Sequence, residues 1–200
     1  MTAIGVQQVP RLPPCGKSNR SFFETFIRVL IVLCAAIAVI LSSISVCDGR
    51  WLLAHEKLFG LWHYCVTSDF STPTCTTDID FAQVEGLSVG MIFCRSALSF
   101  AVISAIFGLE LMMVSLICED VHSRRKWFLG SLLIIISFVL SSGGVLGFVI
   151  VLRNYVTFTG FTLPYWCEFT AVFLFFLNGI SGIHINSITN PWNRPSTGKV

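Results

Sequence analysis

The sequence predicts an all-α membrane protein, a bundle of four transmembrane helices that carries a small extracellular antiparallel β-sheet. Three observations predict this fold class. The chain of 200 residues is 54% hydrophobic and only 12% charged, its mean hydropathy is +0.78, and its apolar residues gather into four long runs. Soluble domains carry about 25% charged residues. Lipid is therefore the solvent in which most of this chain is expected to fold.

The four apolar runs are each near or above the roughly 20 residues that a helix needs to cross the hydrocarbon core of a bilayer. The expected spans are 26–46, 93–117, 127–152 and 163–183. Ser43 and Ser45 imitate a signal-peptide cleavage site, but the first run is longer than a cleavable core. We therefore expect the first span to be an uncleaved helix.

Lysine and arginine predict the orientation of the spans. Nine of the 13 basic residues lie on the side that holds both termini and the loop 118–126, and four lie on the other side. The nine are Arg11, Lys17, Arg20, Arg28, Arg124, Arg125, Lys126, Arg194 and Lys199. Short cytosolic loops are enriched in basic residues. We expect a multi-pass protein of the plasma membrane with both termini in the cytosol.

This topology divides the chain into a cytosolic arm (1–25), a four-span domain (26–183) and a cytosolic tail (184–200). The long extracellular loop covers 47–92 and the short one covers 153–162. The long loop mixes polar residues with aromatic ones, a composition that favours short strands and turns. A small sheet is expected there.

Cys65 and Cys75 lie in this long loop, on the oxidising side of the membrane, so a disulfide between them is expected. Closing so short a loop would stabilise it by about 3 kcal/mol on the chain-entropy model. A second bond between Cys47 and Cys167 is an open alternative, because both are placed near the outer boundary. Cys118, at the cytosolic boundary, is either a palmitoylation site or a plain thiol.

The extracellular loop also carries a motif that resembles the signature of the claudin superfamily. Its residues are Trp51, Gly60, Leu61, Trp62, Cys65 and Cys75, followed by Arg95 at the start of the second span. The superfamily includes claudins, peripheral myelin and epithelial membrane proteins, and the gamma subunits of voltage-gated calcium channels. The resemblance implies a claudin-like fold, in which the tryptophans anchor the sheet on the outer membrane face and the two cysteines pair.

Four further runs resemble the gamma-like subunits of voltage-dependent calcium channels: RSFFE (20–24), CDG (47–49), SSGGVLGFVI (141–150) and IHINSIT (183–189). This resemblance implies an auxiliary, non-pore subunit that contacts the pore-forming alpha subunit of a voltage-gated calcium channel. Such a subunit would modulate calcium current and stabilise an inactivated state.

The alternative is a claudin-type adhesion or paracellular barrier protein, which the acidic balance of the extracellular loop would suit. Against it, the tail ends Thr197-Gly-Lys-Val, with glycine in place of the Ser or Thr that a class I PDZ ligand needs two places before the end. An auxiliary protein of AMPA receptors ranks last, since those relatives have a longer first loop and a long tail.

Within the expected spans, Gly143 and Gly147 form a G-x-x-x-G motif that lets helices approach closely. The motif predicts packing either inside the bundle or against a partner, and Gly179 and Gly182 admit the same two interpretations. Glu110 lies at membrane depth, where a carboxylate is costly. We expect it inside the bundle, with Arg28 as its candidate partner, or facing a channel. Glu168 is expected to be interfacial.

The sequence contains no motif that predicts an enzyme, a cofactor site or nucleic-acid binding. Serine, histidine and aspartate occur without an order that would place a nucleophile beside a base, and the positive charges form no long run. His122 follows Glu119 and Asp120, but three such residues on one short loop lack the spacing of a known metal site. A charged turn is expected there.

Overall fold

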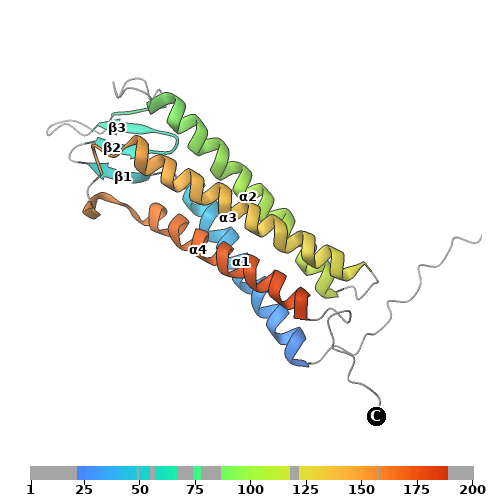
Figure 1. Ribbon diagram of the computed structural model, residues 1–200. Helices are drawn as coiled ribbons and strands as arrows, with labels where there is room; N and C mark the ends of the chain where they lie inside the picture. The colour runs from blue at the N-terminus through green and yellow to red at the C-terminus, as the bar shows by residue number, and fades with distance from the viewer. Residues whose placement is uncertain are drawn as a thin grey trace, which may run out of the picture.

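Four long helices run side by side, and a small sheet covers one end of the bundle (Figure 1). The computed structural model describes residues 22–48, 50–54, 57–66, 74–77, 87–117, 122–156 and 158–188. The helices are α1 (Phe22–Asp48), α2 (Leu87–Ile117), α3 (Ser123–Val151) and α4 (Leu163–Ile188). Each is long and apolar enough to cross a membrane. The predicted four-helix membrane fold is confirmed, and the chain has the build of a multi-pass membrane protein.

The helices extend beyond most ends of the apolar runs. α1, α2 and α3 begin four to six residues before the expected spans, and α4 ends five residues after its span. Hydropathy marks only the part of a helix that lies in hydrocarbon, whereas backbone hydrogen bonds continue into the headgroup region. We therefore expect the additional turns to lie in the headgroup region.

The four helices form a ring in which each packs mainly against two others, in the order α1, α2, α3, α4. The α2–α3 pair packs most extensively and the α1–α2 pair least. One core cluster lies at the sheet end, around Trp51 and Phe148, and another lies in the rest of the bundle, around Trp127 and Phe175. We call the two ends of the bundle the sheet end and the far end.

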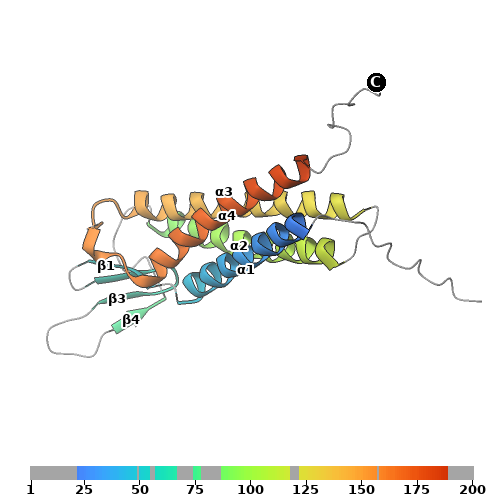
Figure 2. The same cartoon turned by 90° about the horizontal axis from the view of Figure 1, so that it is seen from below.

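The sheet has four antiparallel strands in sequence order, which confirms the small sheet predicted for the long loop. The strands are β1 (Arg50–Ala54), β2 (Lys57–Gly60), β3 (Tyr64–Val66) and β4 (Thr74–Thr76). Figure 2 shows β1, β3 and β4 one below another at the sheet end of the bundle, beside the ends of α3 and α4. Trp51, Leu52 and Ala54 of β1 are buried, whereas Leu53 is half exposed. The sheet thus turns one face toward the bundle.

The connection between α3 and α4 packs along β1. It contains a short 3-10 helix, η2 (Phe158–Gly160), and Phe161 forms an antiparallel bridge with Leu52. The hydroxyl and backbone amide of Thr162 donate to the carbonyls of Arg50 and Trp51. Pro164 then occupies the first turn of α4, where a missing N–H costs nothing. Both extracellular loops of the predicted topology therefore meet in one structure.

Candidate functional site

The signature tryptophans join the sheet to the last turn of α1. Trp51 is fully buried, and its indole N–H donates to the carbonyl of Ser45 at 3.2 Å. Its ring packs edge-on against Phe148 of α3 and Tyr165 of α4, with centroids 5.0 and 5.8 Å away. This one side chain contacts three helices. These contacts hold β1 against the bundle.

Trp62 and Arg95 make a second junction. The indole N–H of Trp62 donates to the carbonyl of Val46 at 2.7 Å. The guanidinium of Arg95 lies 5.3 Å from the Trp62 ring centroid and donates to the carbonyl of Leu61. Arginine stacked on tryptophan gains both a cation–π attraction and a hydrogen-bond donor. The motif residues of the loop therefore connect α1, the sheet and the start of α2.

The disulfide between Cys65 and Cys75 is present and joins two residues directly opposite each other in β3 and β4. Cys47 and Cys167 are free thiols, so the alternative second disulfide is absent from the structure. Cys118, Glu119 and Asp120 lie outside the described residues. His122 immediately precedes α3.

Glu168 is the buried acid of the sheet-end half, so the prediction that it is simply an interfacial residue is wrong in one respect: its side chain is enclosed by protein. Its side chain is fully buried near the start of α4. The hydroxyl of Ser42, on α1, donates to its carboxylate at 3.1 Å. Ser45, one turn further, donates to the carbonyl of Pro164 at 2.7 Å. Two serines of α1 thus bind the first turns of α4, and the acid faces protein rather than water.

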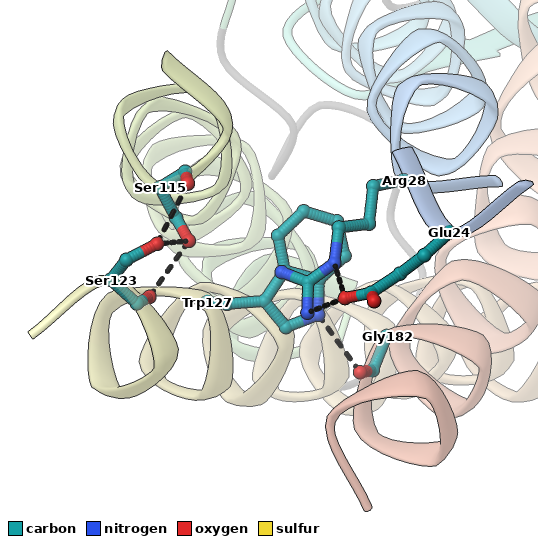
Figure 3. A network of polar contacts seen from close by, with 6 residues as sticks. All are labelled: Glu24, Arg28, Ser115, Ser123, Trp127 and Gly182. Carbon is teal, nitrogen blue, oxygen red and sulfur yellow. Dashed lines mark hydrogen bonds and ion pairs between the residues drawn. The ribbon is translucent and has the colours of Figure 1, made fainter. Parts of the chain in front are cut away.

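The far end is held by a polar network around Trp127 (Figure 3). Arg28 is fully buried, and its guanidinium lies 4.6 Å from the Trp127 ring centroid and 3.0 Å from the carboxylate of Glu24. The Trp127 indole donates to the carbonyl of Gly182 at 2.9 Å. The network links α1, α3 and α4. The predicted pairing of Arg28 with Glu110 is wrong, because Arg28 is paired within its own helix.

A pair of serines connects α2, the remaining helix, to the far-end network. The Ser115 hydroxyl donates to the carbonyl of Ser123, and the Ser123 hydroxyl donates to the carbonyl of Ser115, at 2.7 and 2.8 Å. Both side chains are buried. This reciprocal contact closes α2 onto the start of α3, so all four helices are joined at the far end.

Several glycines lie at close contacts between helices, but Gly143, the first residue of the predicted motif, does not. A Cβ added at Gly143 would meet no atom within 4 Å, so the interpretation that Gly143 packs inside the bundle is wrong. Gly147 does approach a neighbour, since a Cβ there would lie 3.1 Å from Cys94 Sγ. On α4, a Cβ at Gly179 would lie 2.5 Å from Ile135, and one at Gly182 would meet Ser131. The α4 glycines therefore serve packing inside the bundle.

Sequence reasoning missed a close backbone contact between α2 and α3, at Gly108 and Gly130. A Cβ at Gly130 would lie 2.8 Å from the carbonyl oxygen of Gly108, and a Cβ at Gly108 would lie 3.0 Å from that of Gly130. Backbone cannot move aside as a side chain can. The two glycines lie on different runs and form no motif together, so only the pairing of the helices shows their role.

Glu110 lies on the outer surface of α2, so its expected place inside the bundle is wrong. Its side chain is exposed and makes no hydrogen bond or ion pair with any residue in the described part of the chain. The large apolar side chains three, four and seven positions away on this helix are exposed as well. They are Ile103, Ile106, Phe107, Met113, Val114 and Ile117. We call this surface, with Glu110 at its centre, the Glu110 face.

Comparison with known proteins agrees with this geometry. The sequence matches the voltage-dependent calcium channel gamma-like subunit protein family over residues 10–190. The chain belongs to this gamma-like subunit family. It is 60% identical to the human voltage-dependent calcium channel gamma-like subunit over 194 residues, which cover 96% of this chain and all of that relative. The family match covers the residues of both the bundle and the sheet.

The polar groups on the helices of this gamma-like chain differ in whether other residues of the chain bind them. Arg28 and Glu168 are buried and bonded to other helical residues. Glu110 is the contrasting case, a carboxyl group that faces outward from a helix that can cross a membrane. The candidate functional site is therefore the Glu110 face.

Proposed function

We propose that this gamma-like chain is an auxiliary, non-pore subunit of a voltage-gated calcium channel. It binds the pore-forming alpha subunit laterally in the plasma membrane, with both termini in the cytosol, and stabilises an inactivated state. Membership of the gamma-like family supports the class of function, and the human relative is named as a calcium channel subunit. The Glu110 face is the structural observation that supports the lateral contact.

The position of Glu110 along α2 makes its exposure to lipid costly in free energy when the chain has no partner. It lies seven residues before the end of the helix at Ile117, a rise of roughly 10 Å. A glutamate side chain is too short to cover that distance to water. Insertion scales assign about 3 kcal/mol to an acidic residue deep in the membrane. A polar group on a partner's helix would remove this cost, and the surrounding apolar side chains would pack against that helix.

The neighbouring helix extends the same proposed surface. Exposed apolar residues of α1 recur every three or four positions, at Leu30, Leu33, Ile37, Ile40 and Ile44. α1 and α2 pack against each other less than any other neighbouring pair in the ring. A partner helix docking across α1 and α2 would bury both stripes. At the sheet end, the extracellular loop would meet the outer part of the channel.

A subunit modulates a channel only if it binds one gating state better than another. A preference of about 1.4 kcal/mol for the inactivated state shifts that equilibrium about tenfold. One interhelical polar contact contributes about 1 kcal/mol, so its loss would reduce the shift to about twofold. Glu110 is where such a contact is expected.

The test is co-expression with pore-forming alpha subunits, with calcium current amplitude and the voltage of half-inactivation as readouts. Glu110→Gln should keep its surface level, measured by biotinylation, and lose most of the effect on inactivation. Phe107→Ala should act similarly. Phe173→Ala is the matched control, because Phe173 is also 57% exposed but lies on α4, across the ring from α2.

Two results would contradict this proposal at different levels. If the unmodified chain leaves amplitude and inactivation unchanged with several channel types, the auxiliary role is wrong. If Glu110→Gln and Phe107→Ala modulate fully at normal surface levels, the role stands but the Glu110 face is not the contact.

A further inference from the structure

A hollow of about 660 Å³ lies at the far end of the bundle, between the first turns of α3 and the last turns of α4. Among the described residues, it is lined by Arg124, Arg125, Phe128 and Leu129 of α3 and by Asn186 of α4. None of these residues belongs to the Glu110 face or to the far-end network around Trp127. The hollow is therefore a separate feature of the molecule.

The charges at this helix start favour an anion. Basic residues occupy three successive positions in the beginning of α3, at Arg124, Arg125 and Lys126, and its first turn holds no acidic residue. No side chain caps the helix at His122. The N-terminus of a helix carries a partial positive charge and unbonded amide groups. A negative group bound there would gain from both the helix end and these basic side chains.

The polar and apolar residues that line the hollow occupy successive turns of α3: the arginines come first, and the apolar residues follow one turn later. Arg124 lies four residues before Phe128, and Arg125 four residues before Leu129, so each pair shares one side of α3. Four residues correspond to a rise of about 6 Å. Both arginines are exposed, and Phe128 and Leu129 are 42% and 50% exposed. Two guanidinium groups thus lie one helical turn beyond an accessible apolar surface.

We propose that this hollow binds an anionic phospholipid of the leaflet at the far end of the bundle. Arg124 and Arg125 pair with the headgroup phosphate, for which the planar guanidinium offers two parallel donors. Phe128 and Leu129 contact the acyl chains one turn deeper in the bilayer. Basic pockets between transmembrane helices at the cytosolic surface are suited to anionic headgroups, and a free phosphate would leave the apolar part of the hollow unused.

The experiment uses the full chain in phosphatidylcholine nanodiscs that contain phosphatidylserine and phosphatidylinositol bisphosphate, with retained lipids identified by native mass spectrometry. The double variant Arg124→Gln/Arg125→Gln should bind the anionic lipids about thirtyfold more weakly, about fivefold for each arginine. The matched control is Arg50→Gln/Arg153→Gln, which removes two exposed arginines from the sheet end. It should retain the lipids like the unmodified chain.

Three results would overturn the proposal. Anionic lipid bound equally by the double variant and the unmodified chain would show that Arg124 and Arg125 do not hold the headgroup. An equal loss in the sheet-end control would indicate a general charge effect. Displacement of the lipid by soluble inositol trisphosphate at equal concentration would indicate a free-phosphate site. None of these readouts depends on a channel partner.

Discussion

At the scale of single residues, polar groups inside a lipid-embedded bundle must be satisfied by other protein groups, because no water is present there. Glu168 of α4 accepts a hydrogen bond from Ser42 of α1. Arg28 of α1 lies between Glu24 and the face of Trp127 on α3. Each of these buried groups connects two helices, so each contributes to the specific arrangement of the bundle.

Replacement of Glu168 by alanine should destabilise the bundle. The change removes the acceptor of the Ser42 hydroxyl and leaves a cavity in a fully buried position, at an expected cost of about 2–4 kcal/mol. Thermal unfolding of the purified protein in detergent would measure this loss. Phe169→Ala is the control, because Phe169 is the next residue of α4 and is 53% exposed. Equal unfolding temperatures for the two variants would contradict the role assigned to Glu168.

At the scale of elements, the backbones of α2 and α3 come into contact where Gly108 faces Gly130. Gly108 and Gly130 remove two side chains from the contact, and each helix backbone then lies against the other. In a membrane, helices associate through such close packing, because the lipid tails solvate apolar side chains as well as a neighbouring helix does. Small residues therefore allow the two helices to pack closely along the extensive α2–α3 contact.

Gly130→Ala should destabilise the α2–α3 pair by about 1–3 kcal/mol, since the added methyl group would lie 2.8 Å from a backbone oxygen. Gly143→Ala, on the same helix, meets no atom within 4 Å. It should be neutral or stabilising by up to about 1 kcal/mol through helix propensity. Detergent unfolding compares the two variants directly. A Gly143→Ala protein less stable than Gly130→Ala would show that the contact is assigned to the wrong glycine.

The sheet depends on its disulfide for stability, because its strands are only three to five residues long. Cys65→Ala or Cys75→Ala removes about 3 kcal/mol of constraint and leaves an unpaired thiol. Both variants should be retained in the secretory pathway and show reduced surface biotinylation. Cys47→Ala removes an exposed free thiol and should reach the surface normally. If all three variants reached the cell surface normally, the disulfide would not be needed for the sheet to fold.

At the scale of the whole molecule, the bundle is joined at both ends. Trp51 contacts α1, α3 and α4 at the sheet end, while Trp127 and the Ser115–Ser123 contact join all four helices at the far end. The exposed helix surfaces between these two junctions are almost wholly apolar, with Glu110 as an exception. Between its two junctions, the molecule thus presents an apolar side to lipid or to a partner.

The orientation of this body is a prediction of the charge distribution. Reporters at either terminus should be cytosolic, because basic residues favour that side by nine to four. An epitope inserted at Ser71, between β3 and β4 in the sequence, should bind antibody on intact cells. Staining of the Ser71 epitope only after permeabilisation would reverse the orientation, and would place the sheet in the cytosol.

The number of helices, the small sheet and the disulfide of this chain could be predicted from its sequence, and the faces of the helices could not. Spans follow from the length of apolar runs, and the Cys65–Cys75 bond follows from two cysteines in one exposed loop. A helix in water shows its buried side by a polar stripe on the other side. α2 and α3 are apolar on almost every side. Only packing against neighbours therefore decided that Glu110 faces outward, that Glu168 is buried, and that Gly130 rather than Gly143 forms the close contact.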